Sequence, residues 1–381
     1  MKISKIHTHR MILPNARWIF VEIITDTGKS GWGEATDSCD EFGLANLIEE
    51  ESKQLIGKNP EDVMACTDEY FHWKYPSRKI IRTYATAWSA LDQALWDLSA
   101  QSKNMPLWKA LGGRNTKKIP LYANLNNAIR NDRRPEALAQ NGQKALSQGF
   151  KMIKCTPFDE INPSQFDASF DAGFERFDAL MQYADIKQVS IDCHQRFERH
   201  NLARMCEKLL SEYGTPYWLE DPVDIQDFET MHLMNKQYPQ IRWAAGEDAL
   251  HLKAIYTTMK SGCYEVLMPD VKFIGGDSAV RALIPMAEET GFAVSMHNPN
   301  GPISTAHSAH LMTLCRKNVP LEYPFASVAN RELLTTPTEC VKDGYYHLND
   351  EIGLGIKIAD TALREYGETF INGRFCAYST T

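Results

Sequence analysis

Short apolar runs, most of them ending in an ionisable residue, recur at regular intervals through the second part of this 381-residue chain. Eight such runs are present, at residues 119–124, 150–154, 188–192, 217–220, 243–247, 266–270, 293–297 and 319–322. The charged ends of the last six are separated by 28, 27, 23, 27 and 25 residues, about the length of one strand–helix–strand repeat. Eight strands within roughly 230 residues are the number expected for a (β/α) barrel.

The first part of the chain has a different pattern, in which strands are followed by helices. Residues 2–10 and 17–25 read as strands, and residues 40–110 are largely helical in pattern, with apolar residues at three- and four-residue spacing from Ala87 to Leu98. The sequence therefore predicts an α+β capping domain, a barrel that carries the active site and a C-terminal segment that packs back on the capping domain, over residues 1–115, 116–325 and 326–381.

Composition narrows the class of protein further. The chain has 41 basic and 49 acidic residues, and its net charge of −8 argues against nucleic acid or an anionic membrane as a partner. No apolar run is long enough to span a bilayer, and the first residues lack the apolar core of a signal peptide. Nine cysteines are scattered without a C-x-x-C spacing, which indicates reduced thiols. We expect a cytoplasmic protein.

Asp192, Glu220 and Glu247 end three successive runs, and the C-terminal ends of barrel strands meet at one mouth. Three converging carboxylates resist ionising together unless a cation lies between them. Ligation by oxygen alone selects a hard ion, so Mg²⁺ is the expected metal. The alternative is an ion-pair network with lysines, for which the run that ends in Lys154 supplies the nearest partners.

Asp270 and His297 end the next two runs. Neighbouring strands can place an aspartate against an imidazole nitrogen, which makes His297 a candidate general base. His194 lies two residues after Asp192, and the period of a strand would turn it toward the same mouth as a candidate general acid. The alternatives are a structural histidine at 297 and a substrate-binding histidine at 194.

The other histidines singled out are expected to be structural. His7 and His9 form an H-x-H pair on a predicted surface strand that lies far before the barrel. Four more fall on predicted helices or caps: His200, His251, His307 and His310. The chain contains no G-x-S-x-G, Walker or H-E-x-x-H motif.

Five segments, taken in order, resemble the enolase superfamily and its mandelate racemase-like group. The first, residues 89–113, is similar to the signature of that family's capping domain, and the others are similar to its strand ends: WLEDP (218–222), AAGE (244–247), MPD…GG (268–276) and MHNPNGP (296–302). The resemblance covers essentially the whole chain. It implies a TIM-like barrel of the modified (β/α)7β type and a homo-oligomer.

The resemblance also implies roles for the charged strand ends. It makes Asp192, Glu220 and Glu247 the Mg²⁺ ligands. It makes Asp270 and His297 a dyad whose histidine abstracts a proton. Glu322 matches the family's acid at the last strand, which hydrogen-bonds the substrate carboxylate.

Within this group the chain is most similar to acid-sugar dehydratases of the galactonate type. These carry a D-x-H-x-R run, here Asp192 to Arg196, in which the histidine is the acid for the leaving hydroxide. The resemblance implies a sugar acid, aldonate or aldarate, as the substrate and a 2-keto-3-deoxy acid as the product. It implies that Arg196 and Asn298 bind the substrate.

Two positions depart from the patterns of these relatives. Thr156 stands where racemases carry the second lysine of a Lys-x-Lys pair, which leaves Lys154 to polarise the carboxylate and removes the usual second base. Asp248 differs from the residue expected in the galactonate type.

Two alternatives to a dehydratase remain: an epimerase or racemase of a 2-hydroxy or sugar acid, and a sugar-acid-binding protein without turnover. A mobile loop around residues 73–79 is expected to close over the polyol end of the substrate.

Overall fold

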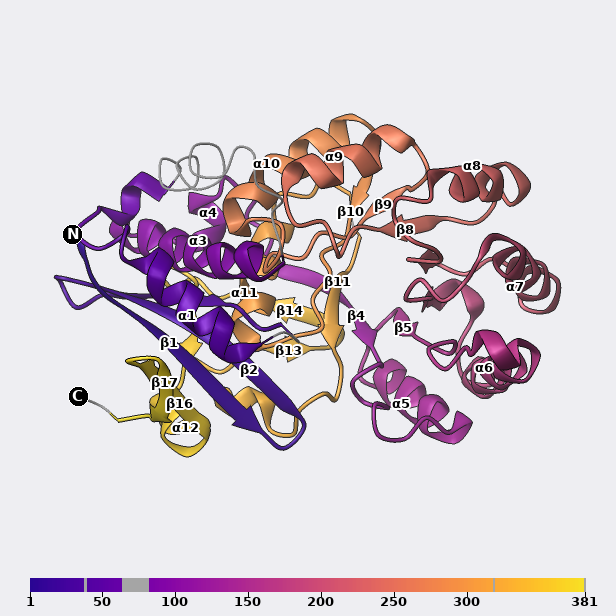
Figure 1. Cartoon of the computed structure of the whole chain (residues 1–381), viewed down its shortest axis with the longest axis horizontal. Helices are drawn as coiled ribbons and strands as arrows, with labels where there is room; N and C mark the ends of the chain where they lie inside the picture. Colours follow the sequence, from indigo (N-terminus) through magenta and orange to yellow (C-terminus); the bar gives the residue numbers. More distant parts are fainter. Residues whose placement is uncertain (38–39, 64–81, 318, 380–381) are drawn as a thin grey trace.

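The computed structural model describes residues 1–37, 40–63, 82–317 and 319–379 (Figure 1). Both ends of the chain contribute to one antiparallel sheet, and the middle of the chain forms a ring of parallel strands surrounded by helices. The loop expected at residues 73–79 lies outside the described residues.

The antiparallel sheet has the strand order β17-β16-β1-β2-β3. Its strands are β1 (Ile3–Leu13), β2 (Ala16–Thr25), β3 (Ser30–Glu34), β16 (Gly367–Ile371) and β17 (Arg374–Ala377). The helices that follow β3 are α1 (Glu41–Ser52), η1 (Pro60–Asp62), α3 (Arg82–Ser102) and α4 (Leu107–Ala110). We call residues 1–115 the N-terminal unit. Because β16 pairs with β1, the C-terminal segment reaches this unit.

Two glycines of β3 allow helix α3 to lie directly against the sheet. A Cβ atom on Gly31 would lie 2.3 Å from the carbonyl oxygen of Ala94, and one on Gly33 would lie 2.0 Å from that of Ala90. No other residue type fits such a close approach of two backbones. The adjacent Glu34 is thereby held at the edge of the unit that faces the barrel.

The middle of the chain alternates strands and helices as the spacing of the apolar runs predicts. The strands are β4 (Lys118–Asn124), β5 (Ile153–Cys155), β6 (Val189–Asp192), β7 (Trp218–Glu220), β8 (Trp243–Ala245), β9 (Val266–Leu267), β10 (Ala293–Val294) and β11 (Leu321–Pro324). The helices between them are α5 (Pro135–Ser147), α6 (Phe166–Met181), α7 (Arg199–Glu212), α8 (Phe228–Gln237), α9 (Leu252–Ser261), α10 (Gly276–Glu289) and α11 (Pro302–Met312). Short 3-10 turns precede α6 and β6, at η3 (Pro163–Gln165) and η4 (Ile186–Gln188).

The parallel strands form a barrel of the (β/α)7β type. Strands β4 to β10 pair in sequence order, and β11 returns to pair with β4. Between β10 and β11 the amide of Glu322 donates to the carbonyl oxygen of Met296 at 3.4 Å. Figure 1 shows α5 to α9 around the side of the barrel that faces away from the N-terminal unit.

Side chains inside the barrel are arranged in layers. Tyr122 and Trp218 are buried and lie in an edge-to-face contact with ring centroids 5.5 Å apart. Each lies two residues before a polar residue at the strand end, Asn124 or Glu220, so each pair shares one face of its strand. The apolar layer therefore lies directly beneath the polar residues of the mouth.

Three of the charged strand ends lie in loops rather than in strands. Glu247, Asp270 and His297 follow the last residues of β8, β9 and β10 by two or three positions. Gly246 has φ +130, which ends β8 before Glu247. The apolar runs therefore located the mouth correctly but overstated the length of these strands.

The C-terminal segment contacts both parts of the molecule. Its remaining elements are η5 (Arg331–Leu334), β12 (Thr335–Thr336), β13 (Val341–Lys342), β14 (Tyr345–His347), β15 (Lys357–Ile358) and α12 (Asp360–Tyr366). Strand β14 pairs with the beginning of β4, while β16 pairs with β1. The domain limits at residues 115 and 325 stay a prediction.

In the described part of the chain, no helix combines the length and apolar character needed to cross a membrane.

Candidate active site

Three carboxylates meet at the mouth of the barrel. Asp192 ends β6, Glu220 ends β7 and Glu247 follows β8, and one oxygen of each lies within 4.8 Å of the others. Oδ2 of Asp192 and Oε2 of Glu247 are buried and accept no hydrogen bond from the described residues, although cationic groups lie within ion-pair distance. A cation that prefers oxygen ligands fits this set, because it would satisfy these atoms and offset their mutual repulsion.

The ammonium group of Lys154 lies beside two of these carboxylates. Its Nζ atom is 2.8 Å from Oε1 of Glu220, 3.2 Å from Oδ2 of Asp192 and 3.0 Å from Oε1 of Glu322. Burial would lower the pKa of Lys154, but the surrounding carboxylates, Glu220 and Glu322 above all, raise it well above its usual value. The ion-pair network considered from the sequence is therefore present, with one ammonium group in contact with three acids.

The three carboxylates differ in their affinity for a proton. Burial raises the pKa of Glu220 to about 8, whereas the pKa of Asp192 stays below its usual range because Lys154 and His194 outweigh the effect of burial. The pKa of Glu247 is also lowered, since His297 outweighs burial there. Glu220 therefore holds a proton at neutral pH, and a cation that binds the triad must displace it.

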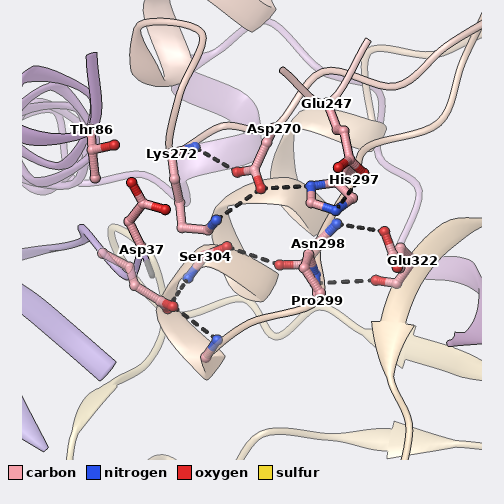
Figure 2. Close-up of polar contacts among 12 residues, drawn as sticks. Asp37, Thr86, Glu247, Asp270, Lys272, His297, Asn298, Pro299, Ser304 and Glu322 are labelled. Carbon is pink, nitrogen blue, oxygen red and sulfur yellow. Dashed lines mark hydrogen bonds and ion pairs between the residues drawn. The ribbon is translucent and has the colours of Figure 1, made fainter. Parts of the chain in front are cut away.

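His297 lies between two carboxylates (Figure 2). Its Nδ1 atom is 2.8 Å from Oδ2 of Asp270, and its Nε2 atom is 3.0 Å from Oε2 of Glu247. Burial would lower the pKa of His297, but Glu247 and Glu322 raise it well above its usual value. The structure thus brings the predicted dyad together and leaves Nε2 as the nitrogen that faces the triad.

Lys272 is a buried residue of this site that the sequence analysis did not identify. Its backbone amide donates to Oδ1 of Asp270 at 2.8 Å, and its Nζ atom donates to Oδ2 at 2.8 Å, as Figure 2 shows. Burial would raise the pKa of Asp270, but Lys272 and His297 lower it to about 2. Asp270 is therefore ionised and fixed when it contacts His297. A lysine two residues after a strand-end aspartate is the only signal for this role.

His194 reaches the triad by a route that differs from the predicted one. Strand β6 ends at Asp192, and His194 has φ +44, so a left-handed turn rather than the strand period directs its ring. Nε2 lies 3.1 Å from Oδ2 of Asp192, and Nδ1 lies 2.7 Å from Oδ1 of Asp159. Although burial opposes it, these two carboxylates raise the pKa of His194 to about 11. The ring is protonated at neutral pH.

Glu322 and Asn298 form a buried pair beside the dyad. The backbone amide of Asn298 donates to Oε2 of Glu322 at 2.8 Å, while Oε1 accepts from Asn124 and Lys154. The side-chain amide of Asn298 donates to Thr305 at 2.8 Å. It also accepts from Ser304 at 2.8 Å, as Figure 2 shows. These contacts use the polar atoms of Asn298 within the protein, beside Glu322. Substrate binding by Asn298, which the resemblance implies, stays a prediction.

Arg196 lies apart from this cluster. Its side chain is exposed, and within the described residues it makes no hydrogen bond or ion pair. Only its backbone is held, by an amide hydrogen bond to the carbonyl oxygen of Cys193 at 2.9 Å. Substrate binding by Arg196 stays a prediction.

A cavity of about 240 Å³ opens between the N-terminal unit and the barrel, with His297 and Lys272 in its wall. The N-terminal unit contributes the turn between β1 and β2 and the start of β2, including Arg17 and Trp18. The barrel contributes the loop after β4, including Arg130. The sequence alone does not bring these residues together, because they meet only when the two parts of the chain pack.

Asp248, which departs from the pattern expected of the galactonate type, links the two parts of the chain beside this cavity. It pairs with Arg82 at 2.5 Å, and Arg82 also lies 3.1 Å from Asp37 of the N-terminal unit. The guanidinium group of Arg82 lies over the ring of Phe273, 3.9 Å from its centroid. Asp248 therefore has a structural partner in the N-terminal unit.

Glu34 fixes the loop that follows His297 from the side of the N-terminal unit. Its carboxylate accepts from the amides of Gly301 and Ser304, at 2.8 and 2.9 Å, at the start of α11. His307 of α11 contacts the carbonyl oxygen of Trp32 at 2.9 Å. These contacts hold α11 and the preceding loop in a defined position.

The remaining predicted structural histidines lie on helices or at a helix cap. His200 lies in α7 and His310 in α11, and His251 caps α9. His9 is an exception to the expected surface strand: it is buried in β1 and contacts Thr369 at 3.0 Å, because β16 covers that edge of the strand.

The fold and the site define a capped (β/α) barrel whose mouth combines a three-carboxylate cation site with a histidine–aspartate pair. Comparison with known families gives the same class. Residues 137–362 match the enolase C-terminal domain-like family, and residues 2–112 match the mandelate racemase / muconate lactonizing enzyme N-terminal domain. The chain belongs to the enolase superfamily, with the domains of the mandelate racemase group.

Several curated relatives are similar to nearly all of the chain. A D-galactonate dehydratase of Pectobacterium atrosepticum is 28% identical over 96% of this chain and 94% of its own length. A D-gluconate dehydratase of Thermoproteus tenax is 25% identical over 92% of this chain and 71% of its own. A D-xylonate dehydratase of Haloferax volcanii is 24% identical over 95% of this chain and 89% of its own.

A solved structure supports the fold. An enolase superfamily member from Salmonella Typhimurium superposes with a TM-score of 0.84 at 23% identity, covering 97% of this chain and 99% of the other.

Proposed function

We propose that the chain is an Mg²⁺-dependent sugar-acid dehydratase. It would abstract the proton α to the carboxylate and eliminate the β-hydroxyl group to give a 2-keto-3-deoxy acid. The observation that carries this proposal is the position of His297, whose Nε2 atom lies at the carboxylate triad while Nδ1 is held by Asp270. The three curated relatives described above are named as sugar-acid dehydratases, which supports the same reaction.

Asp192, Glu220 and Glu247 would hold the metal ion. The oxygen-only donor set and the two buried oxygens without hydrogen bonds favour a hard divalent ion, and Mg²⁺ is the one we propose. When bound, the ion supplies positive charge next to the substrate carboxylate. Lys154 supplies further positive charge from the protein side, because its ammonium group is fixed between Glu220 and Glu322.

His297 is the proposed base. Its Nε2 atom takes the α-proton, and the resulting imidazolium ion is stabilised by the ionised Asp270. His194 is the proposed acid, because its raised pKa keeps it protonated at neutral pH. It gives its proton to the β-hydroxyl group, which leaves as water, and the enol product then tautomerises to the keto acid.

Thr156 favours dehydration over racemisation. It stands where a second base is expected in racemases, and it is buried beneath Arg133, whose guanidinium group contacts the Thr156 carbonyl oxygen at 2.5 Å. One base suffices for elimination, whereas inversion at the α-carbon needs a proton donor on the opposite face. Epimerisation would be recognised by a product that keeps its β-hydroxyl group.

The product itself provides the test. The enzyme is incubated with Mg²⁺ and a panel of hexonates, pentonates and aldarates, and the 2-keto acid is detected as its semicarbazone. We expect ketone formation from one or a few acids, lost in the presence of a chelator. A protein that binds these acids without forming a ketone would be a sugar-acid-binding protein instead. A homo-oligomeric state, a cytoplasmic location and the absence of a nucleic-acid or membrane partner stay predictions.

A further inference from the structure

The cavity above His297 is cationic in a chain that is acidic overall. Of the fifteen described residues that line it, four are arginine or lysine and one is an acid, while the whole chain carries a net charge of −8. Such a local concentration of positive charge attracts an anionic ligand. The four cations are Arg17, Arg82, Arg130 and Lys272.

Two of these four cations are neutralised by neighbouring carboxylates. Arg82 lies 3.1 Å from Asp37 and 2.5 Å from Asp248, and Lys272 lies 2.8 Å from Asp270. Their charges are therefore used to join the N-terminal unit to the barrel and to fix the dyad. They leave little positive charge for a ligand.

The other two cations are differently placed. Arg130 donates to Oδ1 of Asn127 at 2.9 Å and pairs with no carboxylate in the described part of the chain. Arg17 lies 4.0 Å from Glu41, but Glu41 makes its closer pair, at 2.8 Å, with Arg10. Arg17 and Arg130 are thus the cations of the cavity that can take an anion.

Arg130 is also connected by hydrogen bonds to the loop that carries His297, the proposed base. Asn127, which accepts its hydrogen bond, donates from Nδ2 to the carbonyl oxygen of Pro299 at 3.0 Å. Pro299 lies two residues after His297 in the same loop. The guanidinium group is therefore positioned relative to His297 through two hydrogen bonds, and a guanidinium group matches the planar geometry of a carboxylate.

We infer that Arg130, with Arg17, binds a second carboxylate of the substrate, so that the substrate class is a sugar diacid (an aldarate) rather than a monoacid. This inference rests on the proposed function, in which the first carboxylate lies beside Lys154 and the triad. The polyol chain then spans the cavity from His297, whose Nε2 atom lies beside Glu247 of the triad, to Arg130. Because Arg17 comes from the N-terminal unit and Arg130 from the barrel, the second carboxylate would join the two parts of the protein.

The test compares aldarates with aldonates of the same configuration, as galactarate with galactonate and glucarate with gluconate. In the wild-type enzyme with Mg²⁺, we expect kcat/KM for the preferred aldarate to exceed that of its aldonate by roughly tenfold or more, as the loss of a charge-assisted hydrogen bond implies. Arg130→Gln should reduce this ratio to near one, mainly through the KM of the diacid. Arg134→Gln is the matched control, because Arg134 is exposed, pairs with Asp132 and lies outside the cavity lining.

A binding measurement separates failure of this inference from failure of the proposed function. His297→Asn enzyme with Mg²⁺ is titrated calorimetrically with the same acids, so that no turnover is needed. Tighter binding of the diacid that disappears in the His297→Asn/Arg130→Gln double variant supports the inference, whether or not the wild-type enzyme dehydrates any acid. Equal kcat/KM for aldonate and aldarate, or equal binding of both, overturns it. Dehydration of the aldonate alone would leave the dehydratase intact and exclude the diacid.

Discussion

Nε2 of His297 lies 3.0 Å from Oε2 of Glu247, so the proposed base is in direct contact with a proposed metal ligand. Glu247 is the leading cause of the raised pKa of His297 among the groups that favour its charged form. A cation bound to Glu247 would weaken that attraction, because its positive charge offsets the carboxylate. The base and the metal site are therefore coupled electrostatically.

This coupling predicts that Mg²⁺ lowers the pKa of His297. Without metal, His297 should stay protonated well above pH 6.5, and saturating Mg²⁺ should shift its titration to lower pH. The titration is followed by NMR of ¹⁵N-labelled imidazole, and the ring of the exposed His200 serves as the control signal. An identical His297 titration with and without Mg²⁺ would show that Glu247 and the metal do not interact.

Removal of one carboxylate of the triad should abolish the cation site. In Glu220→Gln we expect Mg²⁺ affinity to fall by more than the roughly 10- to 100-fold that loss of an outer-shell partner costs, as measured by titration calorimetry. The wild type should release a proton on binding at neutral pH, since burial raises the pKa of Glu220 to about 8. Glu175→Gln, an exposed acid of α6, is the control. Unchanged affinity in Glu220→Gln would exclude this site.

Substitution of His194 should separate the two halves of the reaction. His194→Asn removes the proposed acid but leaves His297, Asp270 and the triad in place, so we expect dehydration to slow by roughly 10²- to 10⁴-fold while α-proton exchange continues. Exchange and elimination are followed together by proton NMR in D₂O. Dehydration at the wild-type rate would mean that another group supplies the proton, and Lys272 in the cavity wall would be the next residue to substitute.

Buried His310 should make the fold sensitive to acid. Nδ1 accepts from the amide of Trp108 at 3.0 Å and Nε2 donates to the carbonyl oxygen of Leu354 at 2.9 Å, and burial lowers the pKa of His310 to about 3. Below pH 6.5, His310 binds a proton in the unfolded chain but not in the folded chain. The free energy of unfolding therefore falls as the pH drops toward 3, by about 1.4 kcal/mol per pH unit from this group.

The measurement is the free energy of unfolding from pH 7 to pH 4 for the wild type and for His310→Gln. The variant should be less stable at pH 7 but should lose less stability on acidification. His200→Gln, in which an exposed ring is replaced, should follow the wild type. A parallel loss of stability in His310→Gln and the wild type would show that His310 is protonated in the folded state.

The sequence predicted the barrel because its signal is local and repeated. Apolar runs at regular spacing, each followed by an ionisable residue, indicate strands whose ends meet, and the positions of Asp192, Glu220, Asp270 and His297 follow from that topology. The strand limits were less accurate, since Gly246 and the residues around Asp270 and His297 leave the strand conformation before the charged side chain.

Contacts across the boundary between the two parts of the chain could not be predicted. Arg82 pairs with Asp248, 166 positions away, and Glu34 caps a helix that begins 268 residues later, and neither pairing leaves a pattern in the sequence. His194 was placed near the triad for the wrong reason, because positive φ values at His194 and Gln195 are not visible in a run of polar residues. The hydrogen bonds of Asn298 likewise depend on partners from α11 and β11, which lie later in the chain.

The most direct test of the account is proton NMR in D₂O with Mg²⁺, applied to the wild type and to His297→Asn over a panel of aldarates, hexonates and pentonates. For the wild type we expect loss of the α-proton signal together with growth of a deuterated methylene group on the substrate it prefers. We expect neither change with His297→Asn. Exchange at the wild-type rate in His297→Asn, or a wild-type enzyme that exchanges and dehydrates none of these acids, would contradict the account.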